Sequence, residues 1–143
     1  MSTSCIFCKI VEGSAPSSKV YEDDLCLAFM DIQPVNPGHV LVIPRAHFSA
    51  LSDLPTETGG HLFQVAQRIA LSLPKTNVRN EGVDFFLANG AAAGQEVFHV
   101  HLHVIPRYEG DGFGFRFGPN YNNLPARSEL AAIAAQIKQQ LGK

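Results

Sequence analysis

The residues that could take part in catalysis or metal binding are concentrated in one short segment, where three histidines alternate with apolar residues. His99, His101 and His103 are three of the six histidines in the 143-residue chain. In an extended strand successive side chains point to opposite faces, so these imidazoles share one face, about 6.6 Å apart from one to the next. The apolar residues between them point the other way, toward a core. The segment therefore predicts a strand with one chemical face.

A single histidine is usually only part of a polar strand face and has no chemical role. Three histidines at a strict spacing of two are hard to explain in that way. Two chemical interpretations remain open, namely metal ligation and nucleophilic or acid-base chemistry on a phosphate. A neutral imidazole has an unperturbed pKa of about 6.5, so at pH 7 it can attack phosphorus without first losing a proton. The spacing by itself does not choose between the two.

Cys5 and Cys8, separated by two residues near the N-terminus, form a second candidate site. The sequence contains three cysteines, an odd number that argues against a disulfide framework. Two thiolates supply half of a tetrahedral zinc site. The alternative is a pair of small buried cysteines without a metal. Cys26 lies in a predicted strand, and we expect it in the core.

Composition and charge limit the class of protein. A chain of 143 residues is long enough to bury one core without disulfides or metals, so one domain is expected. The net charge is −2 and the basic residues are scattered, which argues against a nucleic-acid polymer as partner. The N-terminus lacks the features of a signal peptide, and no apolar run is long enough to span a membrane. These observations predict a cytoplasmic protein with no membrane partner.

Apolar patterns predict the elements that must position the candidate residues. The segment at 39–43 is almost continuously apolar and is expected to be a central strand. A helix is expected over about 54–73, with Ser52 or Asp53 as its cap and Pro74 as its stop. The remaining expected elements are a small knuckle at 5–10, strands at 20–22, 25–30, 84–88 and 97–105, and a closing amphipathic helix with Leu130, Ile133, Ala134, Ile137 and Leu141 on its apolar face.

Residues 99–105 resemble the signature His-φ-His-φ-His-φ-φ, with φ apolar, of the histidine triad (HIT) nucleotide-binding family. Residues 5–10, 27–32, 37–44 and 94–98 are similar to other blocks of the family in the same order, so the resemblance covers about 5–107. It implies an α+β fold, the HIT fold, with a five-stranded antiparallel sheet, two main helices, and the sheet extended across a homodimer. A single HIT domain is expected over 1–143, with the triad block at 99–105 and a C-terminal tail and helix at 108–143.

The resemblance also implies an activity. Family enzymes cleave a nucleoside monophosphate from an amine, phosphate or polyphosphate leaving group through a covalent nucleotidyl-histidine intermediate. It implies a hydrolase or nucleotidyl transferase acting on nucleoside phosphoramidates or dinucleoside polyphosphates, with a purine nucleotide as substrate. His101 would be the nucleophile, and His103 and His39 would flank the phosphate. The implied nucleotide-binding residues are Asn89 and Gln95 at the phosphate, Asp31 at the ribose, and Phe7, Phe29 and Ile32 around the base.

Zinc-bearing members of the family take their ligands from positions that correspond here to Cys5, Cys8, His47 and His99. The resemblance therefore implies a structural zinc ion and gives His99 a structural role, with His101 and His103 left for catalysis. Zinc-finger peptides bind their metal with about 10–16 kcal/mol. A whole domain is stable by roughly 5–15 kcal/mol, so metal binding would decide whether the N-terminal segment is ordered.

The sequence departs from the family pattern in three places. Glu96 stands where the eukaryotic phosphoramidase branch has a serine close to the leaving group, and a carboxylate there would repel a polyphosphate. Met30 replaces a histidine of that branch, a change expected to affect base packing only. The tail from Tyr108 onward is more similar to bacterial members, and the eukaryotic phosphoramidases are no guide to it.

Two other functions are compatible with the sequence. One is a nucleotide-binding adaptor with little catalytic activity, whose partners dock on the glycine- and aromatic-rich residues 110–117. The other is zinc-dependent hydrolysis by a cluster of His99, His101 and His103. The second leaves the two N-terminal cysteines and His47 unexplained.

Overall fold

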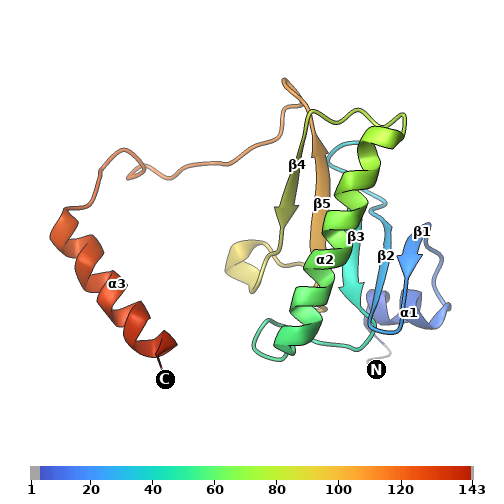
Figure 1. The fold of residues 1–143 in the computed structure, drawn as a ribbon, viewed down its shortest axis with the longest axis horizontal. Coiled ribbons are helices and arrows are strands. Elements are labelled where there is room, and N and C mark those ends of the chain that lie inside the picture. The colour runs from blue at the N-terminus through green and yellow to red at the C-terminus, as the bar shows by residue number, and fades with distance from the viewer. Residues whose placement is uncertain (1–3, 143) are drawn as a thin grey trace. The chain divides into compact units, whose positions relative to one another are not determined.

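The computed structural model describes residues 4–142 and contains a five-stranded antiparallel sheet with helices (Figure 1). The strands lie in the order β1-β2-β3-β5-β4. They are β1 (Lys19–Glu22), β2 (Cys26–Met30), β3 (Val40–Pro44), β4 (Gly82–Phe86) and β5 (Leu102–Arg107). The helices are α1 (Ile6–Glu12), α2 (Thr56–Ser72) and α3 (Arg127–Leu141), with single 3-10 turns η1 (Leu73–Lys75) and η2 (Ala91–Ala93). The predicted α+β class and the five-stranded antiparallel sheet are confirmed.

The central part of the sheet is covered on both faces. β3 lies between β2 and β5, as predicted for the central strand, and all of its residues are buried. On one face α2 packs against β3 and β5, so that Leu62 and Val65 join Val42 and Val104 in one core (Figure 1). Because neighbouring residues of a strand point to opposite faces, the alternate residues of β2 and β3 are available for a second core.

The second core is built by α1, the segment predicted as a small knuckle. Phe7 and Ile10 pack against Leu27 and Leu41 on the face opposite α2. Cys5 is the N-cap of this helix, and its Sγ accepts a hydrogen bond from the backbone N–H of Cys8 at 3.4 Å. A helical first turn brings residues three apart to the same end of the helix, so both sulfurs lie together.

The paired part of β5 begins at Leu102, five residues later than the predicted start. β3 pairs with β5 only up to Val42, because the rest of β3 pairs with β2 alone. The backbone N–H of Val100 instead donates to the carbonyl of Phe48 at 2.8 Å. Since Val100 still lies in the α2 core beside Val104, the alternation of faces continues beyond the ladder.

α2 has the predicted extent but not the predicted cap. Its N-cap is Pro55, whose side chain cannot accept a hydrogen bond, and neither Ser52 nor Asp53 caps the helix. The first turn of α2 therefore begins without a side-chain cap. Pro74 lies within η1, which directly follows the last residue of α2.

The chain divides into two compact units, residues 1–112 and 113–143. The first unit contains all five strands. The second contains α3, the predicted closing helix, and none of its residues 127–141 is buried. A single domain over the whole chain stays a prediction. Within residues 4–142, no helix is long and apolar enough to cross a membrane.

Candidate functional site

The three alternating histidines lie on the α1 side of the sheet. The ring of Phe7 contacts those of His99 and His101, with centroids 5.9 and 5.2 Å away, and the rings of His101 and His103 are 5.0 Å apart. Val100, between them in sequence, faces the α2 core. The division into a chemical face and a core face is therefore as the alternation predicts.

Each of the three imidazoles has a different partner. His99 Nε2 lies 2.8 Å from the carbonyl oxygen of Pro44, and His101 Nδ1 lies 2.8 Å from the carbonyl oxygen of His99. His103 Nδ1 lies 2.8 Å from Nε2 of His39. Since these nitrogens serve separate hydrogen bonds, the arrangement does not favour one metal ion held by the whole row.

The hydrogen bond of His101 fixes where its proton lies. A carbonyl oxygen can only accept, so His101 Nδ1 must be the donor and carry the proton. In the neutral ring the lone pair is then on Nε2. His101 is buried, and its ring is held between Phe7 and His103. This imidazole is therefore held in one orientation with a lone pair on Nε2, which is the chemical requirement for a nucleophile.

A chain of hydrogen bonds gives His103 the opposite tautomer to that of His101. The backbone N–H of Val35 donates to His39 Nδ1 at 3.0 Å, so a neutral His39 carries its proton on Nε2. That Nε2–H donates to His103 Nδ1, with a carboxylate oxygen of Asp31 at 3.5 Å from the same nitrogen. His103 Nδ1 is thus an acceptor, and the proton of His103 is on Nε2. His103 is arranged to donate a hydrogen bond, for example to a phosphate oxygen.

Burial keeps both of these rings neutral. Removal from water lowers the pKa of His103 to about 4, and repulsion from the nearby His101 and His39 adds to the effect. Burial likewise lowers the pKa of His39, against the opposing attraction of Asp31. At neutral pH the two rings are therefore in the protonation state that the hydrogen bonds require.

Most of the residues expected around the base and ribose lie near the histidine row. Phe7 and Phe29 are buried and meet edge to face with ring centroids 5.5 Å apart. Asp31 directly follows β2, its Oδ1 accepts from the backbone N–H of Gln33 at 2.8 Å, and its other oxygen faces His39. Ile32 is 98% exposed. The structure thus brings Phe7, Phe29 and Asp31 to the histidines and leaves the Ile32 side chain in solvent.

The side-chain amides of Asn89 and Gln95, both expected at the phosphate, stabilise the loop that follows β4. Gln95 is buried, its Oε1 accepts from the backbone N–H of Gly90 at 2.8 Å, and its Nε2 donates to the carbonyls of Ser49 and Val97. Asn89 Oδ1 accepts from the backbone N–H of Leu51 at 2.9 Å. Because the Gln95 amide is used within the protein, its expected contribution at the phosphate is to hold this loop in place.

The four residues expected to bind zinc come together. Cys8 Sγ lies 3.2 Å from His47 Nδ1 and 3.6 Å from His99 Nδ1, and Cys5 Sγ lies 3.5 Å from His99 Nδ1. All four ligand atoms lie within 4.8 Å of one another. The α1 N-terminus supplies the two sulfurs, and the segment after β3 supplies His47.

This donor set fits a tetrahedral zinc ion. Zinc bonds of about 2.3 Å to sulfur and 2.0–2.1 Å to nitrogen give sulfur-to-nitrogen edges of about 3.6 Å in a tetrahedron. The observed sulfur-to-nitrogen distances are 3.2 to 3.6 Å. His99 Nε2 donates to Pro44, which leaves Nδ1 unprotonated and turned toward the sulfurs, and the Ser49 hydroxyl lies 3.3 Å from His47 Nε2. Both imidazoles are therefore oriented as ligands.

Sequence reasoning missed two polar residues with buried side chains that support the site. Asn36 is 4% exposed, its side chain donates to the carbonyl of Pro106 and to Asp111, and its own carbonyl accepts from the N–H of His39 at 3.2 Å. Asp111 also receives two hydrogen bonds from Arg107. The available signals were an asparagine next to a proline in the loop before a central strand and an aspartate between two glycines. They are turn signals, which do not indicate burial.

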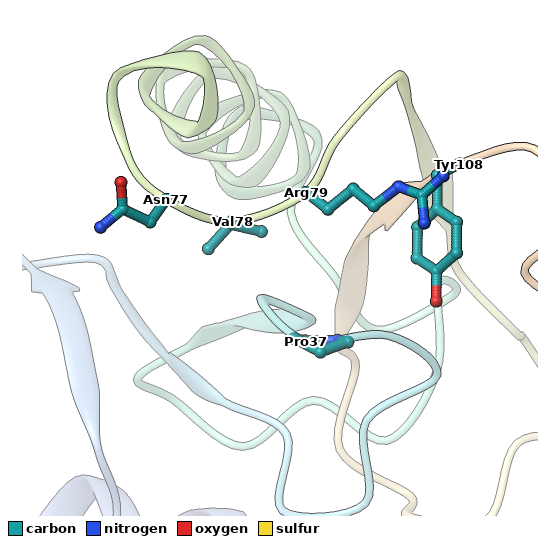
Figure 2. A pocket seen from close by; sticks show the side chains of 5 residues that line it. All are labelled: Pro37, Asn77, Val78, Arg79 and Tyr108. Carbon is teal, nitrogen blue, oxygen red and sulfur yellow. The ribbon is translucent and has the colours of Figure 1, made fainter.

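A cavity of about 530 Å³ lies apart from the histidine row (Figure 2). It is lined by Pro37, Asn77, Val78, Arg79 and Tyr108. Figure 2 shows the Arg79 side chain extended toward the Tyr108 ring, with its guanidinium carbon 4.0 Å from the ring centroid. The same guanidinium is ion-paired with Glu81 at 3.2 Å. Its charge is therefore already compensated, and no histidine lines this cavity.

Comparison with known proteins agrees with this geometry. The HIT domain family model matches residues 12–110. A HIT family protein of known structure from Bacillus anthracis is 42% identical, with a TM-score of 0.87 over 98% of this chain and 99% of that one. A zinc-bound histidine triad family protein from Mycobacterium smegmatis is 41% identical, with a TM-score of 0.76 over 98% and 99% of the two chains.

A relative from Arabidopsis thaliana carries the name adenylylsulfatase HINT3. It is 38% identical over 137 residues, which are 96% of this chain and 69% of that protein. The family match covers the elements that build the histidine site, from the end of α1 to the end of β5. The chain belongs to the HIT domain family.

Proposed function

We propose that the protein is a nucleotide-binding hydrolase or nucleotidyl transferase that cleaves a nucleoside monophosphate from its leaving group through a covalent intermediate on His101. The observation that carries the proposal is the hydrogen bond from His101 Nδ1 to the carbonyl of His99, because it leaves a lone pair on Nε2 in the middle of the row. An oriented imidazole with a free lone pair meets the first requirement of nucleophilic catalysis at phosphorus.

In the first step His101 Nε2 attacks the α-phosphorus. A nitrogen–phosphorus bond forms while the bond from phosphorus to the leaving nitrogen or oxygen breaks, and the leaving group keeps that electron pair and takes a proton from solvent. The imidazole becomes positively charged, and the carbonyl of His99 stabilises that charge through Nδ1–H. Water then attacks phosphorus, the electron pair returns to Nε2, and a proton and the nucleoside monophosphate are released.

The surroundings of His101 suit a nucleotide. The Nε2–H of His103 is available to a phosphate oxygen, with His39 behind it. We propose that Asp31 accepts hydrogen bonds from ribose hydroxyls and that the buried rings of Phe7 and Phe29, which make this side of the site apolar, favour a purine base. We further propose that Ile32 covers the base when it is bound, and that Asn89 and Gln95 act at the phosphate through the loop that they fasten. The plant relative, by its name an adenylylsulfatase, supports nucleotidyl transfer as the reaction class.

We propose a structural zinc ion held by Cys5, Cys8, His47 and His99. The zinc-bound mycobacterial relative and the tetrahedral arrangement of the donor atoms support this proposal. When bound, the ion would link α1 to the chain before β5. Because His101 is not among the ligands, zinc has no direct part in the proposed reaction.

We also propose a cytoplasmic homodimer. β4 is an edge strand of the sheet, and Phe86 at its end and Phe63 on α2 are exposed. An edge strand flanked by exposed aromatic residues is suited to pairing with a second copy. A reducing compartment suits three free thiols, of which two would be metal ligands. Sedimentation of the purified protein at micromolar concentration, expected at twice the monomer mass, tests the assembly.

The alternative function is a nucleotide-binding adaptor. It is favoured by one observation, the exposure of Phe113, Phe115 and Phe117 in the second unit. An adaptor would bind a nucleotide without turning it over. Hydrolysis of an adenosine phosphoramidate by the purified protein distinguishes the two functions.

The test of the proposed reaction is replacement of His101 by alanine. We expect kcat to fall by more than about 10³-fold, because the nucleophile is lost, while the nucleotide Kd changes little. Acid-labile nucleotidyl-protein should be trapped from the natural protein and be absent from the variant. His61, which binds Asp23 at 2.6 Å outside the row, gives the matched control His61→Ala. A His101→Ala variant with the natural rate would overturn the proposal.

A further inference from the structure

A second cavity lies near His99, the end of the histidine row that belongs to the proposed zinc site. Its volume is about 380 Å³, and it is lined by Ser4, Cys5, Ile6, His47, Ser49, Glu96, Val97 and Phe98. The ring of His47 contacts that of His99, with centroids 5.1 Å apart, so the cavity adjoins the first histidine of the row. Asp31 and His39 lie at the opposite end, against His103. His101 stands between the two.

This placement assigns the two ends of the row to different parts of a substrate. A phosphorus atom attacked by His101 bears a nucleoside on one oxygen and a leaving group on another substituent. The nucleoside is expected at the His103 end, where Asp31 can meet the ribose. The leaving group is then directed toward the His99 end. Val97 of the cavity wall packs against the core cluster that contains Phe7, and the ring of Phe7 contacts that of His101, so the cavity is separated from His101 by these side chains only.

The charge of this cavity is negative. Glu96 is the carboxylate among the residues that line it, and none of these residues is lysine or arginine. Two thiolates and two neutral imidazoles around a zinc ion sum to zero charge, so a filled metal site would leave the sign unchanged. Arg45, directly after β3, and Arg107, the last residue of β5, are ion-paired with acidic residues elsewhere. A polyphosphate entering the cavity would meet a like charge without a compensating cation.

Resting on the proposed function, we infer that this cavity is the leaving-group site and that Glu96 selects leaving groups that carry a positive charge. Phe98, 50% exposed, supplies an apolar wall for a carbon chain, and the Ser49 hydroxyl and the Glu96 carboxylate accept hydrogen bonds from an ammonium group at its end. The substrate class is a nucleoside phosphoramidate of an amine with a second, protonated amino group. Dinucleoside polyphosphates are rejected by repulsion.

The experiment uses three adenosine phosphoramidates whose leaving amines have equal length and end in an ammonium, a methyl or a carboxylate group. The scissile bond is the same in all three, so only the charge of the tail varies. We expect kcat/KM to be highest for the ammonium and lowest for the carboxylate, differing by about five-fold per charge, as for a partly exposed ion pair. High salt should reduce the differences.

Two variants and a control decide whether Glu96 is responsible. In Glu96→Gln the ratio of kcat/KM between the ammonium and carboxylate substrates should fall toward one, and in Glu96→Lys it should invert. Glu109→Gln makes the same change of net charge beyond the far end of β5 and should keep the natural ratio. A ratio near one in the natural protein, or one that survives in Glu96→Gln, overturns the inference.

The methyl-terminated substrate separates this inference from the proposed function. If the natural protein cleaves it and forms the covalent intermediate, the reaction stands whatever the charge preference is. If it is not cleaved and no nucleotidyl-protein is trapped, the proposed function fails and the inference fails with it.

Discussion

At the level of single residues, hydrogen bonds to the backbone decide what each imidazole can do. The carbonyl of His99 holds the proton of His101 on Nδ1, and the N–H of Val35, acting through His39, holds that of His103 on Nε2. Two neighbouring histidines of the same chemical type therefore present a lone pair and a donor. Such pairs of opposite polarity are what attack on a phosphate requires, since the nucleophile and the oxygen-binding group must differ.

The link through His39 can be tested by removing its donor. In His39→Leu, His103 is free to place its proton on Nδ1, so a hydrogen bond to the phosphate is lost and kcat should fall roughly ten-fold. In His39→Gln the side-chain amide can still donate, and most of the rate should return. Nitrogen-15 NMR of His103 reports the tautomer directly. An unchanged tautomer in His39→Leu would show that His39 does not position the proton.

At the level of elements, the loop between β2 and β3 positions His39 and depends on a glycine. Gly38 has φ +96, and a Cβ there would lie 2.7 Å from Cγ1 of Val78. A left-handed backbone and a steric clash therefore oppose any side chain at this position. The same loop carries Val35 and Asn36, both of which bond to His39.

Gly38→Ala should destabilise the protein by about 1–3 kcal/mol, the usual cost of one strained backbone position. Urea unfolding measures this loss. The double variant Gly38→Ala with Val78→Ala removes the clash with Val78 but keeps the unfavourable φ and a 3.1 Å approach to Cγ of Pro106, so it should recover only part of the stability. Full recovery would mean that sterics alone require the glycine.

α1 supplies both sulfurs of the proposed zinc site and a core residue beside His101. Cys8→Ser should abolish zinc binding and lower the melting temperature, because the ion would link α1 to His47 and His99. Nucleotidyl-protein should still form on the folded fraction, since His101 is not a ligand. Metal analysis and calorimetry measure the two effects, and Cys26→Ser, at a buried cysteine outside this site, is the control for thiol loss. Protein purified without chelators that contains no zinc would contradict the site.

At the level of the whole molecule, burial of the histidines links stability to pH. The pKa of His103 is about 4 in the folded protein, against about 6.5 in an unfolded chain. Between these values the unfolded state binds more protons, so stability rises with pH. The contribution of His103 is complete above about pH 6.5 and is lost as the pH falls toward 4, and burial of His39 acts in the same direction.

Denaturant unfolding at several pH values tests this linkage. The natural protein should lose stability on acidification from pH 7 to pH 4.5, and His103→Asn should lose less. Metal loss would contribute equally to both proteins, so it cancels in the difference between their losses of stability. Identical slopes would show that His103 titrates alike in the folded and unfolded states.

Much of the fold could be predicted from local patterns. The later part of the alternation at 99–105, the apolar run of β3 and the helical spacing of α2 correspond to regular elements, because the geometry of a strand or helix converts residue spacing directly into faces. One error is of element type, because the segment predicted as a small knuckle is the helix α1. The others lie where elements end. The start of β5 depends on the extent of its partner strands, and the cap of α2 depends on Pro55.

By itself, the sequence determined which residues share a face, and through the family resemblance it predicted four zinc ligands and one attacking histidine. Only the tertiary structure decided the tautomers of His101 and His103, the use of the Gln95 amide within the loop, and the burial of Asn36 and Asp111. The physical reason is how far apart in the sequence the interacting groups lie. Spacing along the chain fixes local direction, whereas a proton position or a buried polar contact is set by groups that are distant in sequence and meet only on folding, such as Asn36 and Asp111, 75 residues apart.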